Sequence, residues 1–535
     1  MFWADRIAGE VAERFKDKLA KGGSIIVRDE KTVSGRVHVG SMRGVAIHGA
    51  VSEALAEMKM PKKFSYEFND FDPMDDIPTY LDRSKFEPYL GMSLREVPSP
   101  DSSAQSFAEF FANDFKGVIA ESGFLPEFYW ASDLYLSGRM DDVIREALAG
   151  AEAIRRIYKQ VSGSQRDDSW LPINIICPQC RKMTTTRADS FDGEKVHFTC
   201  KVEAVEYTKG CGYHGSVSPF GGAAKLPWKV EWPAKWKVLG VEVEGGGKDH
   251  STKGGSRDVA LHISKEVFNY EPPFDVPYEF FLIAGKKMSS SKGRGSSARE
   301  IADLMPPKIF RLALLSKDIN QAFNFDPEGD TIPVLFDQYD RLAESYWAGV
   351  RDDYARLFEF VHPTLSPSSE GRQLPVKHFL PRFSQVAFIA QMKHLDYLEE
   401  IGKLKEAPLT KEDIEEANER KEYALRWLSD YAPEKFVFKL HDTLPEDARH
   451  LSDIQKTALL QLLSFLEESV AMPDGEALHH KLHEIKETAA IPPAELFSAI
   501  YLSFLGKSFG PKAGWFLSVL DREYVLRRLR EATAR

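Results

Sequence analysis

The chain has 535 residues, of which 43% are hydrophobic and 28% are charged. This composition is ordinary for a globular protein, and the length exceeds what one hydrophobic core supports, so several domains are expected. The net charge of −11 excludes a protein coated in positive potential, such as a non-specific DNA binder. No uninterrupted apolar run has the length of a signal peptide or a membrane span, so we expect a cytoplasmic protein with no membrane partner.

Three basic stretches interrupt the acidic average, at residues 181–187, 225–237 and 286–299. Clusters of this kind are most often solvated surface, because lysine and arginine are seldom buried. We interpret the first two stretches in that way. The third coincides with a motif described below.

The first 70 residues have the pattern of a nucleotide-binding unit. Residues 24–27 are a short β-branched run that predicts a buried parallel strand, and the alanine-rich residues 45–58 predict a helix. A loop with two glycines, residues 34–41, lies between them, and a second strand is predicted at 64–68. Strand, glycine-bearing loop and helix form half of a βαβ unit.

Later segments predict more strands of the same sheet. Residues 259–263 and 278–283 are apolar runs, and the second leads directly into a loop of Gly, Lys and Ser. Residues 238–244 are strand-like and precede three consecutive glycines. We therefore predict an α/β fold with one Rossmann-type parallel sheet that is split by insertions.

After about residue 330 the pattern is that of long amphipathic helices. Ser452 and Gln455 predict a capping box, after which apolar residues, Ile454 among them, recur on one helical face. The proline pair at 492–493 is expected to begin another helix, which Gly506 would end. Residues 363–372 predict a turn-rich loop. An all-helical domain follows for residues 331–535.

The loop after the first strand carries the first motif with chemical meaning, Ser34-Gly-Arg-Val-His-Val-Gly-Ser41. A helix N-terminus at this position offers unpaired N–H groups and a positive dipole end to a phosphate, and Gly40 permits close approach. His38 can donate a hydrogen bond to phosphate oxygens as charge builds on them. His48, inside the following helix, is interpreted as structural.

Residues 285–293 form the second motif, which reads GKKMSSSKG and follows a late strand. Nucleotidyl transfer needs cations on the leaving pyrophosphate, and lysines on a flexible loop supply them. Lys287 and Lys292 are the candidates, and a basic surface loop is the alternative. Two such motifs in this order, one after the first strand and one after a late strand, are much less expected by chance than either motif alone.

All four cysteines lie close together in the sequence, as Cys177, Cys180, Cys200 and Cys211. A first pair two residues apart, followed by two more cysteines, is typical of tetrahedral structural zinc rather than of disulfides. The second pair is more widely spaced, so His214 is an alternative fourth ligand to Cys211. Free thiols remain the alternative to a metal.

Together the two motifs resemble the paired HIGH and KMSKS motifs of class I aminoacyl-tRNA synthetases. Ser41 stands in place of the last histidine of the first motif, and Ser290 in place of the second lysine of the second. These variants, the tract at 225–258 and the segment at 497–517 resemble the class I lysyl-tRNA synthetases. The resemblance covers nearly the whole chain.

The resemblance implies an enzyme that activates L-lysine with ATP and Mg²⁺ and transfers it to tRNA(Lys). It implies catalytic roles for His38, Lys287 and Lys292. The residues implied in ATP binding are Gly40, Ser41, Asp249, Lys287, Met288, Ser289 and Ser290. Those implied in lysine binding are Thr32, Trp228, His250 and Tyr278. Asp70 and Asp72 are the candidate partners of the lysine ε-ammonium group.

The implied layout is a catalytic domain over residues 1–330, with a cysteine zinc module inserted at about 160–225, and an anticodon-binding domain over 331–535. A glutamyl-specific tRNA ligase is the alternative among enzymes, because its helical domain looks similar. Outside the enzymes, the alternative is a synthetase-derived RNA-binding or regulatory protein. A nucleotidyltransferase that acts without tRNA is a third possibility.

Overall fold

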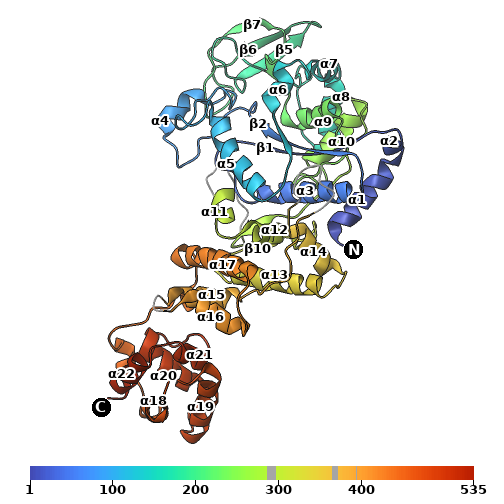
Figure 1. Cartoon of the computed structure of the whole chain (residues 1–535). Coiled ribbons are helices and arrows are strands. Elements are labelled where there is room, and N and C mark those ends of the chain that lie inside the picture. The colour runs from blue at the N-terminus through green and yellow to red at the C-terminus, as the bar shows by residue number, and fades with distance from the viewer. Residues whose placement is uncertain (286–296, 364–371, 393–394, 535) are drawn as a thin grey trace. The chain divides into compact units, whose positions relative to one another are not determined.

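The computed structural model describes residues 1–285, 297–363, 372–392 and 395–534. They belong to two compact units (Figure 1). The first comprises Met1–Asp326 and Gln338–Val376, and the second comprises Pro327–Asp337 and Lys377–Arg535. No helix in the described ranges has both the length and the apolar character needed to cross a membrane.

The first unit begins with helices and strands in the predicted order. These elements are α1 (Trp3–Arg14), α2 (Lys16–Ala20), β1 (Ile25–Thr32), α3 (Ser41–Glu57) and β2 (Lys62–Asn69). The β-branched Ile25 and Val27 of β1 are fully buried, as a strand covered on both faces requires. The strand and helix predictions for this region are confirmed.

A parallel sheet is the centre of this unit. β1 pairs in parallel with β2, and β2 pairs in parallel with β3 (Glu127–Trp130). On the other side of β1, parallel bridges join Val27 to Val243 and Val243 to Phe274. The order from β3 through β2 and β1 to these later segments is that of a Rossmann-type sheet, as predicted.

The late strand is shorter than the sequence indicates. β9 spans Phe281–Ile283 and pairs in parallel with β10 (Phe323–Phe325), while Tyr278 forms a separate parallel bridge with Gly247. Val243 occupies the strand position of the predicted run at 238–244. The first two residues of that run, Val238 and Leu239, are instead the end of α9 (Trp228–Leu239). Gly240, with φ of 68°, is the left-handed cap of the helix.

The prediction of a strand at residues 259–263 is wrong. This run lies inside α10 (Ser256–Glu266), where Val259, Ala260 and Ile263 are buried and His262 is exposed. Spacings of one and four residues place these apolar side chains on one helical face. The short apolar run fits both periodicities, and packing of the helix against α9 decides between them.

The rest of the first unit consists of short helices and small strands. Before α9 these are α4 (Arg83–Phe86), η1 (Glu87–Tyr89), α5 (Phe107–Glu121), α6 (Ala131–Leu136), α7 (Asp141–Ala149), α8 (Ala151–Ser162), β4 (Asn174–Ile175), β5 (Thr186–Phe191), β6 (Val196–Cys200), β7 (His214–Val217) and β8 (Ala224–Lys225). After β9 they are α11 (Ala298–Ala302), α12 (Pro307–Leu315), α13 (Thr331–Trp347), whose first turns belong to the second unit, and α14 (Asp353–Val361).

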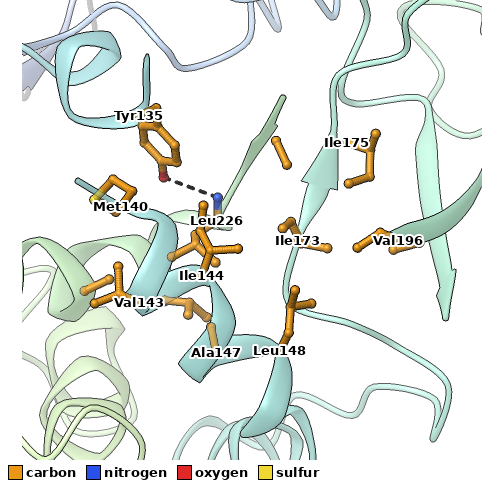
Figure 2. Close-up of a cluster of buried hydrophobic side chains, with 14 of the residues drawn as sticks. Tyr135, Met140, Val143, Ile144, Ala147, Leu148, Ile173, Ile175, Val196 and Leu226 are labelled. Atoms are coloured by element: carbon orange, nitrogen blue, oxygen red, sulfur yellow. Dashed lines mark hydrogen bonds between the residues drawn. The ribbon is translucent and has the colours of Figure 1, made fainter. Parts of the chain in front are cut away.

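The cysteine-bearing insertion shares a hydrophobic core with the helices before it. Met140 and Ile144 from the α6–α7 region belong to the same buried cluster as Ile173 and Val196 of the insertion, and in Figure 2 Ile144 and Ile173 lie between the other two. All four side chains are at most 3% exposed. Burial of this kind contributes about 1.5–3 kcal/mol for each large side chain. The insertion is therefore held by a common core rather than attached as a separate module.

In the second unit the described residues after α14 form helices and no strand, which confirms the all-helical prediction. The helices are α15 (Phe383–Gln391), α16 (Tyr397–Lys405), α17 (Lys411–Asp430), η2 (Glu434–Phe436), η3 (Glu446–His450), α18 (Asp453–Glu468), α19 (Gly475–Thr488), α20 (Pro493–Leu505), α21 (Ala513–Ser518) and α22 (Arg522–Thr533). The predicted loop at 363–372 lies mostly outside the described residues.

Helix ends in this unit follow the sequence signals. Ser452 and Gln455 form the predicted capping box of α18, and Gly506 ends α20 in the left-handed region, with φ of 65°. Ile454, predicted to face inward, is 36% exposed because it lies in the first turn of α18. The caps are local interactions, so the sequence predicts them directly.

Ser452→Ala is expected to lower the free energy of unfolding by about 1 kcal/mol, because the N-cap hydrogen bond to the Gln455 amide is lost. The matched control is Ser508→Ala, which changes an exposed serine outside any helix. Urea unfolding of the full chain, followed by circular dichroism, checks the difference. Equal stability of the two variants would contradict the assigned cap.

Candidate active site

A cavity of about 370 Å³ opens where β1 and the later parallel segments end. Open α/β sheets bind ligands at this carboxyl edge. Eight of the residues implicated by sequence line it, namely Thr32, His38, Gly40, Ser41, Trp228, Asp249, His250 and Tyr278. The fold therefore brings together these eight residues, whereas the two candidate partners of the lysine ammonium group, Asp70 and Asp72, lie outside the lining.

The first motif connects β1 to α3 at the mouth of this cavity. The sequence predicts unpaired N–H groups at the start of α3, but three of them have partners. The amides of Ser41, Met42 and Arg43 donate to the carbonyls three residues earlier, at 3.0, 2.9 and 3.2 Å. Such tight turns are common where an α-helix begins, and they occupy donors that the sequence analysis treated as unpaired. The positive end of the helix dipole remains directed at the cavity.

The second motif lies outside the described residues except for its first residue, Gly285. This applies to Lys287, Met288, Ser289, Ser290 and Lys292. Its two flanks are described.

On the entry side of that motif, Gly285 donates its N–H to Asn324 Oδ1 at 2.6 Å. On the exit side, Ser297 bridges His38 in antiparallel fashion, and the Ala298 N–H donates to the Val37 carbonyl at 2.8 Å. The chain after the second motif is therefore hydrogen-bonded directly to the first motif, although the two are far apart in sequence.

The glycine run at 245–247 forms the third side of the cavity. His48 Nε2 accepts a hydrogen bond from the Gly245 N–H at 2.9 Å, and the Lys248 N–H donates to the Tyr278 carbonyl at 2.9 Å. His48 is fully buried and Asp249 is exposed at the rim. His48 is thus a structural residue, as interpreted from sequence, and it holds this loop against α3.

One wall of the cavity is aromatic and belongs to α9. Trp228 stacks on Trp232 with ring centroids 5.1 Å apart, and His250 lies 5.2 Å from the Trp228 ring. The indole N–H groups of Trp232 and Trp236 donate to Glu244 at 2.9 and 2.8 Å. Trp232 was missed at the sequence level, although tryptophans at 228, 232 and 236 follow helical spacing and mark one face.

Thr32 and Tyr278 lie on different sides of the cavity. Thr32 donates to Asp72 Oδ2 at 2.5 Å. Tyr278 lies beside α3, where a Cβ on Gly44 would come within 2.6 Å of the Tyr278 hydroxyl and 2.7 Å of Asp29 Oδ2. Only glycine at position 44 permits this approach. Burial and then the Asp29 carboxylate raise the pKa of the Tyr278 phenol well above its ordinary value.

Beneath the aromatic wall lies a buried ion-pair cluster, which we call the Arg28 cluster. Arg28 donates to Glu30, Glu67 and Glu244 at 2.5, 2.8 and 2.6 Å. Lys235 pairs with Glu67 and lies 3.3 Å from Glu231. Burial alone would raise the pKa of the Glu67 carboxyl, but Lys235 and Arg28 hold it well below its ordinary value.

The interpretation of residues 225–237 as a solvated surface is wrong for two of its lysines. Lys225 and Lys235 are 2% and 0% exposed. Lys225 pairs with Asp72 at 2.9 Å and with Glu231 at 2.6 Å. Buried lysines require carboxylate partners, and here these come both from α9 itself, as Glu231, and from β2 and the loop after it, as Glu67 and Asp72.

Neither Asp70 nor Asp72 lines the cavity. Asp70 accepts hydrogen bonds from the Ser132 N–H at 2.9 Å and from its hydroxyl at 2.7 Å. Burial raises the pKa of the Asp72 carboxyl, but Lys225 and the Thr32 hydroxyl together lower it more. Both carboxylates therefore already have partners within the protein, and neither is part of the cavity lining.

The four cysteines form a cluster in the insertion. Their sulfur atoms lie within 4.8 Å of one another, with 3.6 Å between Cys177 and Cys211 and 3.7 Å between Cys180 and Cys200. Tetrahedral zinc with Zn–S bonds of about 2.3 Å requires sulfur separations of roughly 3.8 Å, so this donor set fits the ion. His214 lies outside the group and contacts Thr199 at 3.2 Å.

A split Rossmann sheet with a glycine-bearing loop and a ligand-sized cavity at its carboxyl edge is the architecture of a class I tRNA synthetase catalytic domain. Residues 1–364 match the profile of the family described as "tRNA synthetases class I (K)", and residues 376–533 match "Anticodon binding domain". The chain belongs to this family, the class I lysyl-tRNA synthetases.

Similar curated proteins extend over the full length. The lysine–tRNA ligase of Methanosarcina barkeri is 34% identical, over 99% of this chain and 97% of its own. Lysine–tRNA ligase 1 of Methanosarcina acetivorans is 33% identical, over 100% and 98%. The lysine–tRNA ligase of Methanocaldococcus jannaschii is 31% identical, over 99% of each.

The glycine run offers a matched test of the cavity's backbone. At Gly245 a Cβ would lie 1.9 Å from the Val276 carbonyl oxygen, whereas at Gly246 the nearest atom would be 3.5 Å away. Gly245→Ala is therefore expected to lower the free energy of unfolding by about 3 kcal/mol, and Gly246→Ala by less than about 0.5 kcal/mol. Urea unfolding followed by tryptophan fluorescence measures both, and similar values would contradict the described packing.

Proposed function

We propose that this protein charges tRNA(Lys) with L-lysine in two steps that consume ATP. The observation that carries the proposal is the cavity itself, because eight of the residues implied by the family resemblance line it at the carboxyl edge of the sheet. Full-length similarity to proteins named lysine–tRNA ligase supports the same substrate.

In the first step, a carboxylate oxygen of lysine attacks the α-phosphorus of ATP, and the bond from that phosphorus to the pyrophosphate breaks. Bound Mg²⁺ would neutralise phosphate charge. His38 would donate a hydrogen bond to the phosphate oxygens, near the positive end of α3. Lys287 and Lys292 would stabilise the leaving pyrophosphate. Gly40, Ser41 and Asp249 would contact the nucleotide, as would Met288, Ser289 and Ser290.

In the second step, a ribose hydroxyl at the 3′ end of the tRNA attacks the activated carbonyl and AMP leaves. Thr32, Trp228, His250 and Tyr278 would hold the amino acid throughout. Indole and imidazole faces suit an alkyl stem that ends in a cation. In this layout residues 1–330 carry the chemistry, and residues 331–535 read unstacked anticodon bases.

A specific observation disfavours the glutamyl alternative. Four carboxylates, those of Asp29, Glu30, Glu244 and Asp249, line the cavity, against one lysine, Lys31, among the described residues. An anionic side chain would be repelled by these carboxylates, whereas a cationic one would be attracted. A regulatory RNA-binding protein would need neither the aromatic wall nor the cavity.

Charging of total tRNA with each labelled amino acid, in the presence of ATP and Mg²⁺, tests the function. Lysine alone is expected to be incorporated. A Lys287→Ala, Lys292→Ala double variant should lower kcat by at least about 100-fold, with smaller changes in KM, because the lysines act on charge that develops during the reaction.

The control variant is Lys159→Ala, which removes an exposed lysine from α8. It should charge tRNA like the unaltered protein. Incorporation of glutamate would transfer the assignment to the alternative ligase, and absence of charging with every amino acid would favour the RNA-binding alternative.

We further propose that Cys177, Cys180, Cys200 and Cys211 bind one structural zinc ion. The purified protein is then expected to contain about one zinc per chain by elemental analysis. Cys211→Ser should lose most of this metal and lower the thermal unfolding temperature, while His214→Ala should retain it. Retention of zinc by Cys211→Ser together with its loss from His214→Ala would identify the histidine as the ligand instead.

A further inference from the structure

The carboxylates of the cavity differ in how many partners they already have. Both carboxylate oxygens of Glu244 already accept hydrogen bonds, from Arg28, Trp232 and Trp236 at 2.6, 2.9 and 2.8 Å. Asp249 is exposed at the rim rather than buried beside the aromatic wall. Asp29 and Glu30, next to each other in β1, are the two remaining carboxylates.

Asp29 and Glu30 point to opposite faces of the sheet, because successive side chains of a strand alternate. Asp29 is on the α3 face, 3.5 Å from His48, and it also accepts a hydrogen bond from the Glu30 N–H at 2.8 Å. Glu30 is on the α9 face with Lys235, which lies 3.7 Å away. That is the face of the aromatic wall formed by Trp228 and Trp232.

Glu30 is the member of the Arg28 cluster that lines the cavity and still has a carboxylate oxygen available to accept a hydrogen bond. Its side chain is 17% exposed, against 0% for Glu67 and 2% for Glu244. One of its oxygens, Oε2, accepts from Arg28 at 2.5 Å. In the described part of the chain, no hydrogen bond to the other oxygen is found.

The cluster carries more negative than positive charge. Together with the adjoining Lys225 and Asp72, which join it through Glu231, its carboxylates are Asp72, Glu30, Glu67, Glu231 and Glu244, and its cations are Arg28, Lys225 and Lys235. Among the described residues the carboxylates therefore exceed the cations by two. Buried negative charge without a partner is unfavourable, so a cation that enters the cavity gains attraction that a neutral group does not.

We propose that Glu30 accepts the ε-ammonium group of the lysine substrate and thereby sets the preference for a cationic side chain. This inference rests on the proposed function and names the partner that Asp70 and Asp72 cannot supply. The alkyl stem would lie along Trp228, Trp232 and His250, and the ammonium group would reach Glu30 at the base of the cavity.

The ionisation of Glu30 agrees with this role. Burial raises its pKa to about 7, while Arg28 and Lys235 lower it and Glu67 and Glu244 raise it. A lysine ammonium binds the ionised carboxylate, so lysine affinity should fall as the pH falls through 7, by about fivefold from pH 7 to pH 6. His48 also titrates, on the opposite face, where Asp29 raises its pKa against the effect of burial.

The test compares lysine with norleucine, which has a methyl group where lysine has its ammonium group. Calorimetric titration of the full-length protein should show that Glu30→Gln weakens lysine binding about 100-fold and leaves norleucine and ATP binding unchanged. The fall in lysine affinity between pH 7 and pH 6 should also disappear. Any pH dependence caused by His48 would persist in the variant, so the difference belongs to Glu30.

Two control variants test whether the contact with the ammonium group is made by Glu30. Asp70→Asn removes a buried charge outside the cavity, and lysine affinity should stay within about twofold of the unaltered protein. Glu30→Asp keeps the charge on a shorter side chain and should bind lysine weakly while retaining discrimination against norleucine. Thermal unfolding of each variant shows whether it is folded, and Glu30→Asp carries the test if Glu30→Gln is not.

Lysine binding by Glu30→Gln that equals that of the unaltered protein would overturn the inference. Loss of discrimination in Asp29→Asn, with Glu30→Gln unaffected, would also overturn it and move the contact to the α3 face. Failure of the unaltered protein to bind lysine at all would instead reject the proposed function. The two failures are therefore distinguishable.

Discussion

The catalytic unit depends on the buried guanidinium of Arg28. It joins Glu30 of β1, Glu67 of β2 and Glu244 of the next parallel segment, so a single side chain bridges three neighbouring members of the sheet. Removing one partner from a buried charge cluster costs about 3–5 kcal/mol, because the remaining charges lose their compensation. Through Glu244 the same cluster also orients Trp232 of α9. The sheet, its covering helix and the aromatic wall are thus held by one network.

This network also gives the cavity its electrostatic character. The proposed substrates make opposite demands, since a lysine side chain is cationic and a nucleotide polyphosphate is anionic. The carboxylates that line the cavity would attract the lysine side chain, and the positive end of α3, with the lysines of the second motif, would attract the polyphosphate. In the proposed function, each substrate would thus bind beside groups of opposite charge.

Structural features that depend on neighbouring residues were predicted from the sequence, whereas those that depend on contacts between distant residues were not. The β1–α3–β2 unit, the capping box at Ser452 and the left-handed Gly506 follow from patterns within a few residues, and the structure has all of them. Residues 259–263 were misassigned because a five-residue apolar run fits a strand and a helix equally, and only packing against α9 separates the two. Lys235 was read as surface because its partner Glu67 is 168 positions away in sequence.

By itself the sequence determined the class of fold, the two loop motifs, the cysteine set and the eight implicated residues that line the cavity, since each of these depends on short-range spacing or on family resemblance. Only the tertiary structure decided which carboxylates are free to meet a ligand. Asp72 and Glu30 are both acidic residues beside strand ends. Lys225 forms an ion pair with Asp72, whereas Glu30 has one oxygen without a hydrogen-bond partner among the described residues. That difference arises when distant strands and α9 come together, because neutralising a buried charge requires partners in space rather than in sequence.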